Sequence, residues 1–427
     1  MTFSASQIVQ MEKPVYGGAC LARIDGKAVF VPLTLPGERV RVRIVEEKRG
    51  YATAECEEIV VAVPERIAPA CRHFGSCGGC HYQHTDYATQ LRLKQAILRE
   101  TLERGGVRAA AEIAVLAGQP WGYRNRIRLA ADAAGRLGYR GRRSHAVVPV
   151  SECPIAAPLL MQAAVAIAEA AQRCVPKMRL SEVALYCNAE ETALLASVLA
   201  ERPVKCDFDA FARDVMEHVP ALRGAELVME GHTGGSARVL ARWGDAAITY
   251  CAAGFEYRVD HGAFFQVNRW LVDALVERVI AGQRGALAWD LFAGVGLFAR
   301  QLAKHFARVV AVESAPAAMP ALEANLRGTA GTAVRAETLD FLKKMGTSER
   351  PDLIVVDPPR SGLGKEITAL LGALQAPAMT YVSCDPATLA RDLRALVAAD
   401  YVIESVTMAD LFPQTFHLET VVQLRRA

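Results

Sequence analysis

The amino-acid sequence predicts a multidomain α/β protein: a small β-barrel, then a mixed α+β part, then a doubly wound parallel α/β domain. Three observations support this fold class. Short alternating segments dominate residues 1–62, a compact cysteine cluster follows at 71–80, and short apolar runs alternate with helical patterns after residue 286. We therefore place the domain boundaries at 1–62, 63–274 and 275–427.

The composition is that of a globular protein without a membrane anchor. Of the 427 residues, 52% are hydrophobic and 22% charged, which is enough apolar material for several buried cores. The net charge of +3 excludes a polycation, so any nucleic-acid surface must be local. No signal peptide and no apolar run of membrane-spanning length is found. We expect a cytoplasmic monomer that keeps its 11 cysteines reduced.

Residues 27–32 and 38–45 alternate apolar and polar side chains, and Pro36–Gly37 forms a turn between them. This spacing is typical of a small β-barrel. A β-hairpin module without a binding role fits the pattern equally well.

Four cysteines form the pattern C-x5-C-x2-C followed by a distant Cys-Pro: Cys71, Cys77, Cys80 and Cys153. Glycines between them make the first loop flexible enough to wrap a metal group. Zinc sites more often show two paired C-x2-C knuckles, whereas three ligands on one loop and a distant fourth favour a [4Fe–4S] cluster. Zinc and unliganded thiols remain the alternatives.

Seven arginines lie between residues 121 and 143, opposed by a single acid, Asp132, and interleaved with aromatic residues. Arginine binds phosphate in a fork and aromatic rings stack on unpaired bases, so this segment is a candidate RNA surface. A solvated strand face is the alternative. The candidate RNA-binding residues are Arg124, Arg126, Arg140 and Arg142.

Residues 290–296 (DLFAGVG) follow an apolar run and open a helical pattern, so Gly294 can turn the backbone tightly beside a ligand. Glu313 ends the next predicted strand, where a carboxylate can accept hydrogen bonds from ribose hydroxyls. Glu337 follows the strand after that and could reach an adenine amino group. Each signal alone also fits a structural loop or a solvated carboxylate, but together they favour a nucleoside cofactor.

The tetrapeptide Ser-Cys-Asp-Pro at 383–386 places Cys384 between a predicted strand and a helix, whose N-terminus is expected to stabilise a thiolate. A buried structural cysteine is the alternative. A thiolate that adds to C6 of uracil makes C5 able to attack an electrophilic methyl group, and a general base must then remove the C5 proton. Glu419, in the last predicted strand, is the candidate base. His417 shares its strand face, with a packing or hydrogen-bonding role slightly favoured.

The tetrapeptide Asp-Pro-Pro-Arg at 357–360 argues against two other classes of methyltransferase. Amino-group methyltransferases usually end this motif in an aromatic residue, and 5-methylcytosine enzymes place a cysteine just after the prolines. Arg360 fits neither class.

The chain resembles, over nearly its whole length, the bacterial RNA (uracil-5-)-methyltransferases, and most closely their 23S ribosomal RNA branch. The motifs that carry the resemblance are Tyr16-Gly-Gly, Phe30-Val-Pro, Leu35-Pro-Gly-Glu38, Phe264-Phe-Gln-Val-Asn268, DLFAGVGLF, Ser383-Cys-Asp-Pro386 and His417-Leu-Glu419. The family commonly has Asn where Leu297 stands, and Val where Leu418 stands, so one cofactor contact is lost or replaced.

The resemblance implies an N-terminal OB-like TRAM domain that binds RNA, a central iron–sulfur domain and a Rossmann-like class I methyltransferase domain. It also implies S-adenosylmethionine as cofactor and the four cysteines as ligands of a [4Fe–4S] cluster. Pattern and resemblance together give the expected cofactor contacts Gln266, Phe292, Gly294, Glu313, Glu337 and Asp357. The alternatives are the same chemistry on tRNA, a catalytically silent RNA-binding or assembly factor, and an iron–sulfur redox enzyme, which lacks a second redox motif here.

Overall fold

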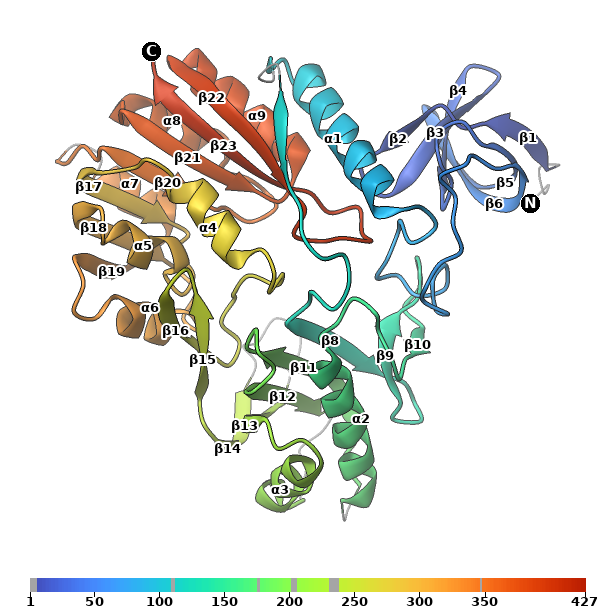
Figure 1. Ribbon diagram of the computed structural model, residues 1–427, viewed down its shortest axis with the longest axis horizontal. Helices are drawn as coiled ribbons and strands as arrows, with labels where there is room; N and C mark the ends of the chain where they lie inside the picture. The colour runs from blue at the N-terminus through green and yellow to red at the C-terminus, as the bar shows by residue number, and fades with distance from the viewer. Residues whose placement is uncertain (1–5, 109–111, 175–176, 201–205, 230–237, 346–347) are drawn as a thin grey trace.

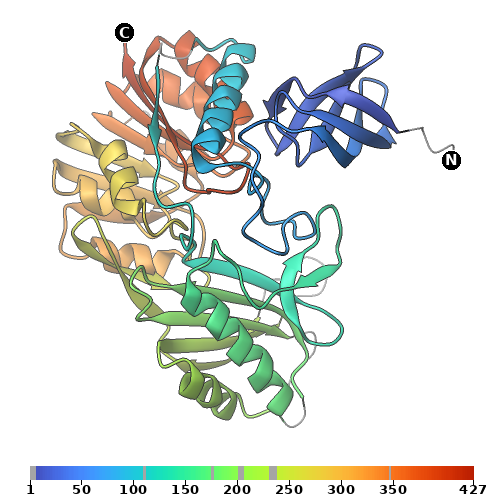
Figure 2. The same cartoon turned by 45° about the vertical axis from the view of Figure 1, so that its right-hand side comes forward.

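The computed structural model describes residues 6–108, 112–174, 177–200, 206–229, 238–345 and 348–427. Within these residues the chain forms sheets of six, seven, two and eight strands (Figure 1). The N-terminal β-domain stands to one side of helix α1, and the central sheet lies below the C-terminal sheet in both views (Figures 1 and 2). None of the helices in these ranges is long and apolar enough to cross a membrane.

The N-terminal β-domain is a curved sheet in the order β1-β5-β6-β4-β3-β2. Its strands are β1 (Gln7–Gln10), β2 (Lys13–Val15), β3 (Ala19–Ile24), β4 (Lys27–Pro32), β5 (Arg39–Glu47) and β6 (Tyr51–Val61). Alternation puts Val29, Val31 and Val40 inside, each at most 1% exposed. The strand predicted at 27–32 is confirmed as β4, because its pattern matches this half-buried surface.

The central sheet has the order β10-β9-β8-β11-β12-β13-β14 and is covered by the helices α2 (Pro158–Arg173) and α3 (Phe208–His218). Its strands are β8 (Arg126–Ala131), β9 (Leu137–Arg140), β10 (Val147–Pro149), β11 (Leu180–Cys187), β12 (Leu194–Ala200), β13 (Leu222–Met229) and β14 (Arg238–Gly244). Helix α2 has a proline, Pro158, in its first turn. Its alanine-rich sequence lets it pack closely on the sheet, with Ala163 and Ala170 at most 1% exposed.

The C-terminal sheet has the order β19-β18-β17-β20-β21-β23-β22-β7. Strands β17 to β21 pair in parallel, and β23 runs antiparallel between β21 and β22. The strands are β17 (Gly285–Leu291), β18 (Phe306–Glu313), β19 (Gly331–Arg335), β20 (Leu353–Val356), β21 (Ala378–Ser383), β22 (Tyr401–Ala409) and β23 (Glu419–Arg426). This is the doubly wound arrangement that the alternating pattern predicted.

Helices cover both faces of the C-terminal sheet, as Figure 1 shows. They are α4 (Val272–Ile280), α5 (Leu297–Leu302), α6 (Met319–Leu326), α7 (Thr338–Met345), α8 (Gly364–Leu374) and α9 (Pro386–Ala398). A hairpin of β15 (Ala247–Ala252) and β16 (Phe255–Asp260) packs against α6.

Residues 87–104 and 113–116 differ from the sequence-based division, which put them in the central part. Helix α1 (Tyr87–Arg104) packs against α9, and β7 (Ile113–Leu116) pairs in parallel with β22. Leu98 and Ile113 are buried in the same core as Trp289. Four residues of strand carry too little pattern to reveal a partner that lies nearly 300 residues later in the chain.

Candidate active site

The two predicted catalytic residues lie on neighbouring strands of the C-terminal sheet. Ser383 is the last residue of β21 and pairs with Thr420 of the antiparallel strand β23. Cys384, the next residue after β21, therefore lies beside Glu419, the first residue of β23. Glu419 is 6% exposed and Cys384 is partly buried. A thiol and a carboxyl that are 35 positions apart in sequence are thereby brought to one edge of the sheet.

The predicted cofactor residues lie along this same edge. The strand order β19-β18-β17-β20-β21 sets Glu337, Glu313, Gly294, Asp357 and Cys384 in one row, each at or just beyond the carboxyl end of its strand. Ligands of open α/β sheets bind in the crevice at these strand ends. The contact of each residue with a cofactor stays a prediction.

Several residues in the loop after β17 have positive φ angles, in the left-handed region of the backbone map. Phe292 has φ +65°, which is strained for a residue with a bulky side chain, and Gly294 and Gly296 have φ +55° and +87°. The Glu313 carboxylate accepts hydrogen bonds from the backbone N–H groups of Gly294 at 2.8 Å and Ser314 at 2.7 Å. Glu313 therefore ties the glycine loop to the end of β18.

Asp290 was not singled out from the sequence. It is fully buried at the end of β17, where its Oδ2 accepts a hydrogen bond from the N–H of Ala299 in α5 at 2.8 Å. Burial raises the pKa of this carboxyl to about 8. An acid that directly precedes a glycine loop at a strand end is the signal that could have revealed it.

Two further predicted cofactor residues differ in burial. Gln266 lies between β16 and α4 and is 8% exposed, and its backbone carbonyl accepts a hydrogen bond from Asn125 Nδ2 at 3.0 Å. Glu337, between β19 and α7, is exposed.

Burial governs the titration of the catalytic pair, and neighbouring charges modify it. Burial raises the pKa of the Cys384 thiol to about 12; the negative charges of Glu419 and Asp357 add to the rise, whereas the Arg360 guanidinium opposes it. Burial, and then the charge of Asp357, raises the pKa of Glu419 well above its ordinary range. Burial also raises the pKa of Asp357 to about 7. The thiol is therefore protonated in the free protein at neutral pH.

A side chain caps the N-terminus of α9, the helix that follows Cys384. Asp385 caps α9, and its Oδ1 accepts hydrogen bonds from the N–H groups of Ala387 at 3.0 Å and Thr388 at 2.9 Å. The amides that could have stabilised a thiolate are thus bound to a carboxylate.

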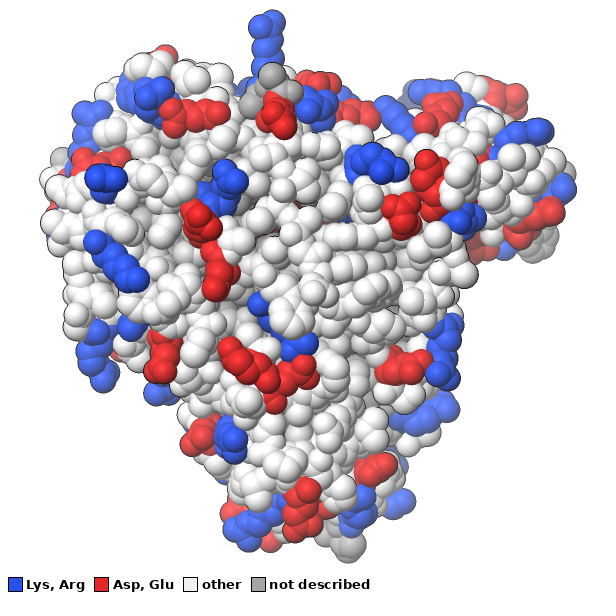
Figure 3. All heavy atoms as spheres, viewed as in Figure 1, with Lys and Arg blue, Asp and Glu red and all other residues white. Residues whose placement is uncertain are grey.

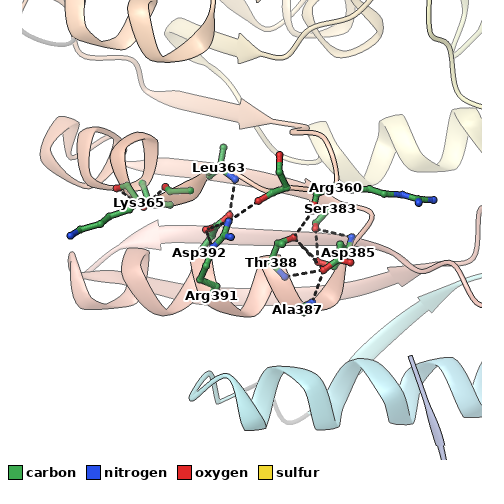
Figure 4. Close-up of polar contacts among 12 residues, drawn as sticks. Arg360, Leu363, Lys365, Ser383, Asp385, Ala387, Thr388, Arg391 and Asp392 are labelled. Carbon is green, nitrogen blue, oxygen red and sulfur yellow. Dashed lines mark hydrogen bonds and ion pairs between the residues drawn. The ribbon is translucent and has the colours of Figure 1, made fainter. Parts of the chain in front are cut away.

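The loop that carries Arg360 is fastened to α9 (Figure 4). Thr388 Oγ1 donates a hydrogen bond to the Arg360 carbonyl at 3.2 Å, and the N–H of Leu363 donates one to Asp392 Oδ2 at 2.7 Å. Arg360 Nη2 lies 3.4 Å from His417 Nδ1, whose ring packs against Phe416. Arg360 is thereby held near Cys384 and His417, and His417 has the packing and hydrogen-bonding contacts that the sequence slightly favoured.

The four predicted ligand cysteines line one cavity of ≈390 Å³ with mostly apolar walls: Cys71, Cys77, Cys80 and Cys153. Burial raises the pKa of Cys80 to about 12. Among the described residues, no group of three or more His, Cys, Asp or Glu side chains could hold a metal ion. The four thiols border one cavity, and their ligation of a metal group stays a prediction.

The candidate RNA-binding arginines fall into two pairs. Arg124 and Arg126 are half-buried and line the cysteine cavity, and Arg126 Nη2 donates a hydrogen bond to the Ala263 carbonyl at 2.6 Å. Arg140 and Arg142 line a second hollow of ≈480 Å³ that reaches Gly17 of the N-terminal β-domain. Lys and Arg side chains gather along the rim around β9 and β10 (Figure 3). RNA contact by all four stays a prediction.

Sequence reasoning named Tyr16 in a motif of the β-domain but not as a site residue; its hydroxyl donates a hydrogen bond to the backbone carbonyl of Cys384 at 3.3 Å. The two residues are 368 positions apart, and no local pattern links them.

Comparisons with known proteins agree with this geometry. The family model described as tRNA (Uracil-5-)-methyltransferase matches residues 245–427, and the TRAM domain model matches residues 7–56. The chain is 34% identical to an uncharacterized RNA methyltransferase of Streptomyces avermitilis, over 98% of each chain. It is 32% identical to the 23S rRNA (uracil(1939)-C(5))-methyltransferase of Halomonas elongata, over 96% of this chain and 87% of the relative.

A solved structure has the same fold. The tRNA (uracil-54, C5)-methyltransferase of Pyrococcus abyssi, in complex with S-adenosyl-L-homocysteine, matches with a TM-score of 0.77 at 22% identity, over 98% of this chain and 100% of that one. The relatives and the two family models confirm the family that the motifs predicted, with its β-rich TRAM domain and its Rossmann-like domain. The chain belongs to the S-adenosylmethionine-dependent RNA (uracil-5-)-methyltransferase family.

Proposed function

We propose that the protein transfers a methyl group to C5 of a uridine in 23S ribosomal RNA, with Cys384 as the covalent nucleophile and Glu419 as the base. The observation that carries the proposal is the placement of Cys384 and Glu419 side by side at the ends of β21 and β23. Ribosomal RNA is favoured as substrate because the Halomonas relative, named for 23S rRNA, is 32% identical over nearly the whole chain.

The chain's residues support each bond change. The Cys384 thiol first gives up its proton to solvent; its sulfur then adds to C6 of the uracil ring, and the electron pair of the C5–C6 double bond moves towards C5 and O4. S-adenosylmethionine, when bound, supplies the electrophilic methyl group that C5 takes up. Glu419 then removes the C5 proton, the double bond re-forms, and Cys384 leaves as a thiolate. The raised pKa of Glu419 makes it a stronger base than an ordinary carboxylate, which suits proton removal at neutral pH.

The residues at the strand ends fit S-adenosylmethionine. A side chain built at Gly294 would meet no heavy atom within 4 Å, so the loop borders open space. The carboxyls of Glu313 and Asp357 lie on either side of this loop in the sheet order. The residues that would hold the cofactor are Gln266, Phe292, Gly294, Glu313, Glu337 and Asp357.

We also propose that Cys71, Cys77, Cys80 and Cys153 hold a [4Fe–4S] cluster. The spacing of three ligands on one loop and a distant fourth supports a cluster over a single zinc ion, and the four thiols share one cavity. Methyl transfer needs no electrons, so the cluster's role is structural. Anaerobically purified protein should contain iron and sulfide in equal amounts, and Cys80→Ser should lose both. Cys251→Ser, at an exposed thiol outside the cavity, is the control. One zinc per chain, or unchanged iron in Cys80→Ser, contradicts the assignment.

The function is tested by trapping. RNA with 5-fluorouridine at the target cannot lose a C5 proton, so the protein should form a stable covalent adduct that migrates slowly on a denaturing gel. Cys384→Ser should form none, and Cys251→Ser should match the wild type. An absent wild-type adduct would favour the silent RNA-binding or assembly factor.

The second candidate is the same chemistry on tRNA, and the fold match to the Pyrococcus tRNA enzyme favours it. Mapping 5-methyluridine in both RNA classes of a deletion strain separates the two. Loss from tRNA alone contradicts the ribosomal assignment.

A further inference from the structure

The N-terminal β-domain reaches the active site through the turn between β2 and β3. Tyr16 in this turn donates its hydroxyl hydrogen to the Cys384 carbonyl at 3.3 Å. Its ring meets Phe416 edge-on, with 5.4 Å between centroids, and Phe416 packs on His417 at 4.2 Å. A residue of the β-domain thus contacts both segments that carry the catalytic pair.

The turn is seated closely. Gly18 has φ +83°, and a Cβ added there would lie 2.9 Å from the His81 ring. The N–H of His81 in turn donates a hydrogen bond to the Gln414 carbonyl at 2.8 Å, in the segment that precedes Glu419. On the other side of the turn, Lys13 lies 2.5 Å from Glu100 of α1. Tyr16 is therefore fixed from both sides.

The Cys384 carbonyl lies outside the regular hydrogen bonding of the neighbouring strand and helix, so the Tyr16 hydroxyl supplies it with a partner. The pairing of β21 with β23 ends at Ser383, and the first hydrogen bond of α9 runs from the N–H of Leu389 to the carbonyl of Asp385. The Cys384 carbonyl lies between these two regular patterns and belongs to neither.

We propose that Tyr16 is a positioning residue, whose hydroxyl holds the Cys384–Asp385 peptide so that the sulfur is presented to C6 of the bound uracil. The inference rests on the proposed function of Cys384. Burial and the charge of Asp385 keep the pKa of Tyr16 well above its ordinary value, so the hydroxyl stays a donor across the working pH range. The β-domain then does more than bind RNA, because its docking sets the orientation of the nucleophile.

Tyr16→Phe tests the role, because it keeps the ring against Phe416 and removes only the donor. The kcat should fall about three- to tenfold, as expected for one lost hydrogen bond, with KM for RNA unchanged. Adduct formation with 5-fluorouridine RNA should slow by the same factor. Tyr401→Phe is the matched control, since Tyr401 donates an equivalent buried hydrogen bond to the Ala376 carbonyl at 3.0 Å, in another part of the fold.

A second readout needs no catalysis. Alkylation of Cys384 by iodoacetamide, followed by peptide mass spectrometry, should change its rate in Tyr16→Phe and not in Tyr401→Phe. The inference is overturned if Tyr16→Phe keeps a wild-type kcat, changes only KM, or loses no more activity than Tyr401→Phe. A wild-type protein that forms no adduct refutes the proposed function instead, while the alkylation comparison still decides the role of Tyr16.

Discussion

The ammonium of Lys94 lies 2.6 Å from Asp410 Oδ1, and both side chains are completely buried. Lys94 also donates a hydrogen bond to the Phe412 carbonyl at 2.9 Å. Helix α1 therefore holds the start of the segment 410–418, which leads into the catalytic strand β23.

Lys94→Met should destabilise the protein by about 3–5 kcal/mol, because it leaves the Asp410 carboxylate buried without a counter-charge. The double variant Lys94→Met/Asp410→Leu should regain most of this loss. Urea unfolding measures both. Lys13→Met, which breaks the partly exposed pair with Glu100, is the control and should cost at most about 1 kcal/mol. An equal loss of unfolding free energy in the single and double variants would show that an unpaired Asp410 is not the cause of the destabilisation.

Arg360→Gln should slow the alkylation of Cys384 at pH 8 by about three- to tenfold, because the guanidinium lowers the pKa of this thiol and its loss leaves less thiolate. The rate is followed against pH by mass spectrometry of the Cys384 peptide. Arg350→Gln is the control, because Arg350 is exposed and donates its hydrogen bond to the Gln375 carbonyl; this variant should leave the pH dependence of the alkylation rate unchanged. Identical profiles for Arg360→Gln and wild type would rule the effect out.

Asp290→Asn should change how stability depends on pH. The folded-state pKa of about 8 lies above the ordinary 3.8, so between these values the folded state keeps a proton that the unfolded chain has lost. The stabilisation from Asp290 is complete below pH 3.8 and disappears as the pH rises through 8.

The stability of the wild type relative to Asp290→Asn should accordingly fall between pH 5 and pH 8, by an amount on the order of a few kcal/mol. Urea unfolding without cofactor at three pH values measures the difference. A difference that is constant with pH would show that Asp290 titrates normally.

Glu419→Gln should trap the reaction after methyl transfer, because the amide cannot remove the C5 proton. With ordinary uridine RNA and S-adenosylmethionine, the variant should accumulate a covalent protein–RNA complex, and turnover should fall at least about a thousandfold. Denaturing gels measure the covalent complex, and release of tritium from RNA labelled at C5 of uridine measures turnover. Glu404→Gln, at an exposed carboxylate on β22, is the control. Normal turnover in Glu419→Gln would remove this residue from the mechanism.

Local pattern predicted much of the fold and the row of site residues. Alternation located β4 to the residue, and the motifs at 290–296 and 383–386 placed Gly294 and Cys384 at strand ends, where chain geometry alone positions a ligand site. These features depend on residues close in sequence, so the sequence displays them directly.

Features that depend on distant contacts were out of reach. The density of arginines at 121–143 did not reveal that Arg126 lies 4.6 Å over the Tyr186 ring and is half-buried. The thiolate-stabilising helix end was expected from Pro386, yet the side chain of Asp385 occupies its amides. Both outcomes depend on which of several side chains occupies a hydrogen-bonding or packing site. The periodicity of the sequence does not determine that choice.

The parallel pairing of β7 with β22 has a consequence for how the polypeptide is made and divided. During synthesis, residues 113–116 emerge long before residues 401–409. The backbone groups of β7 therefore have no partner strand until translation is nearly complete. A fragment that begins at residue 275 would leave β22 as a bare edge, a template for self-association into insoluble material. The methyltransferase fold of this chain is therefore not a detachable C-terminal half.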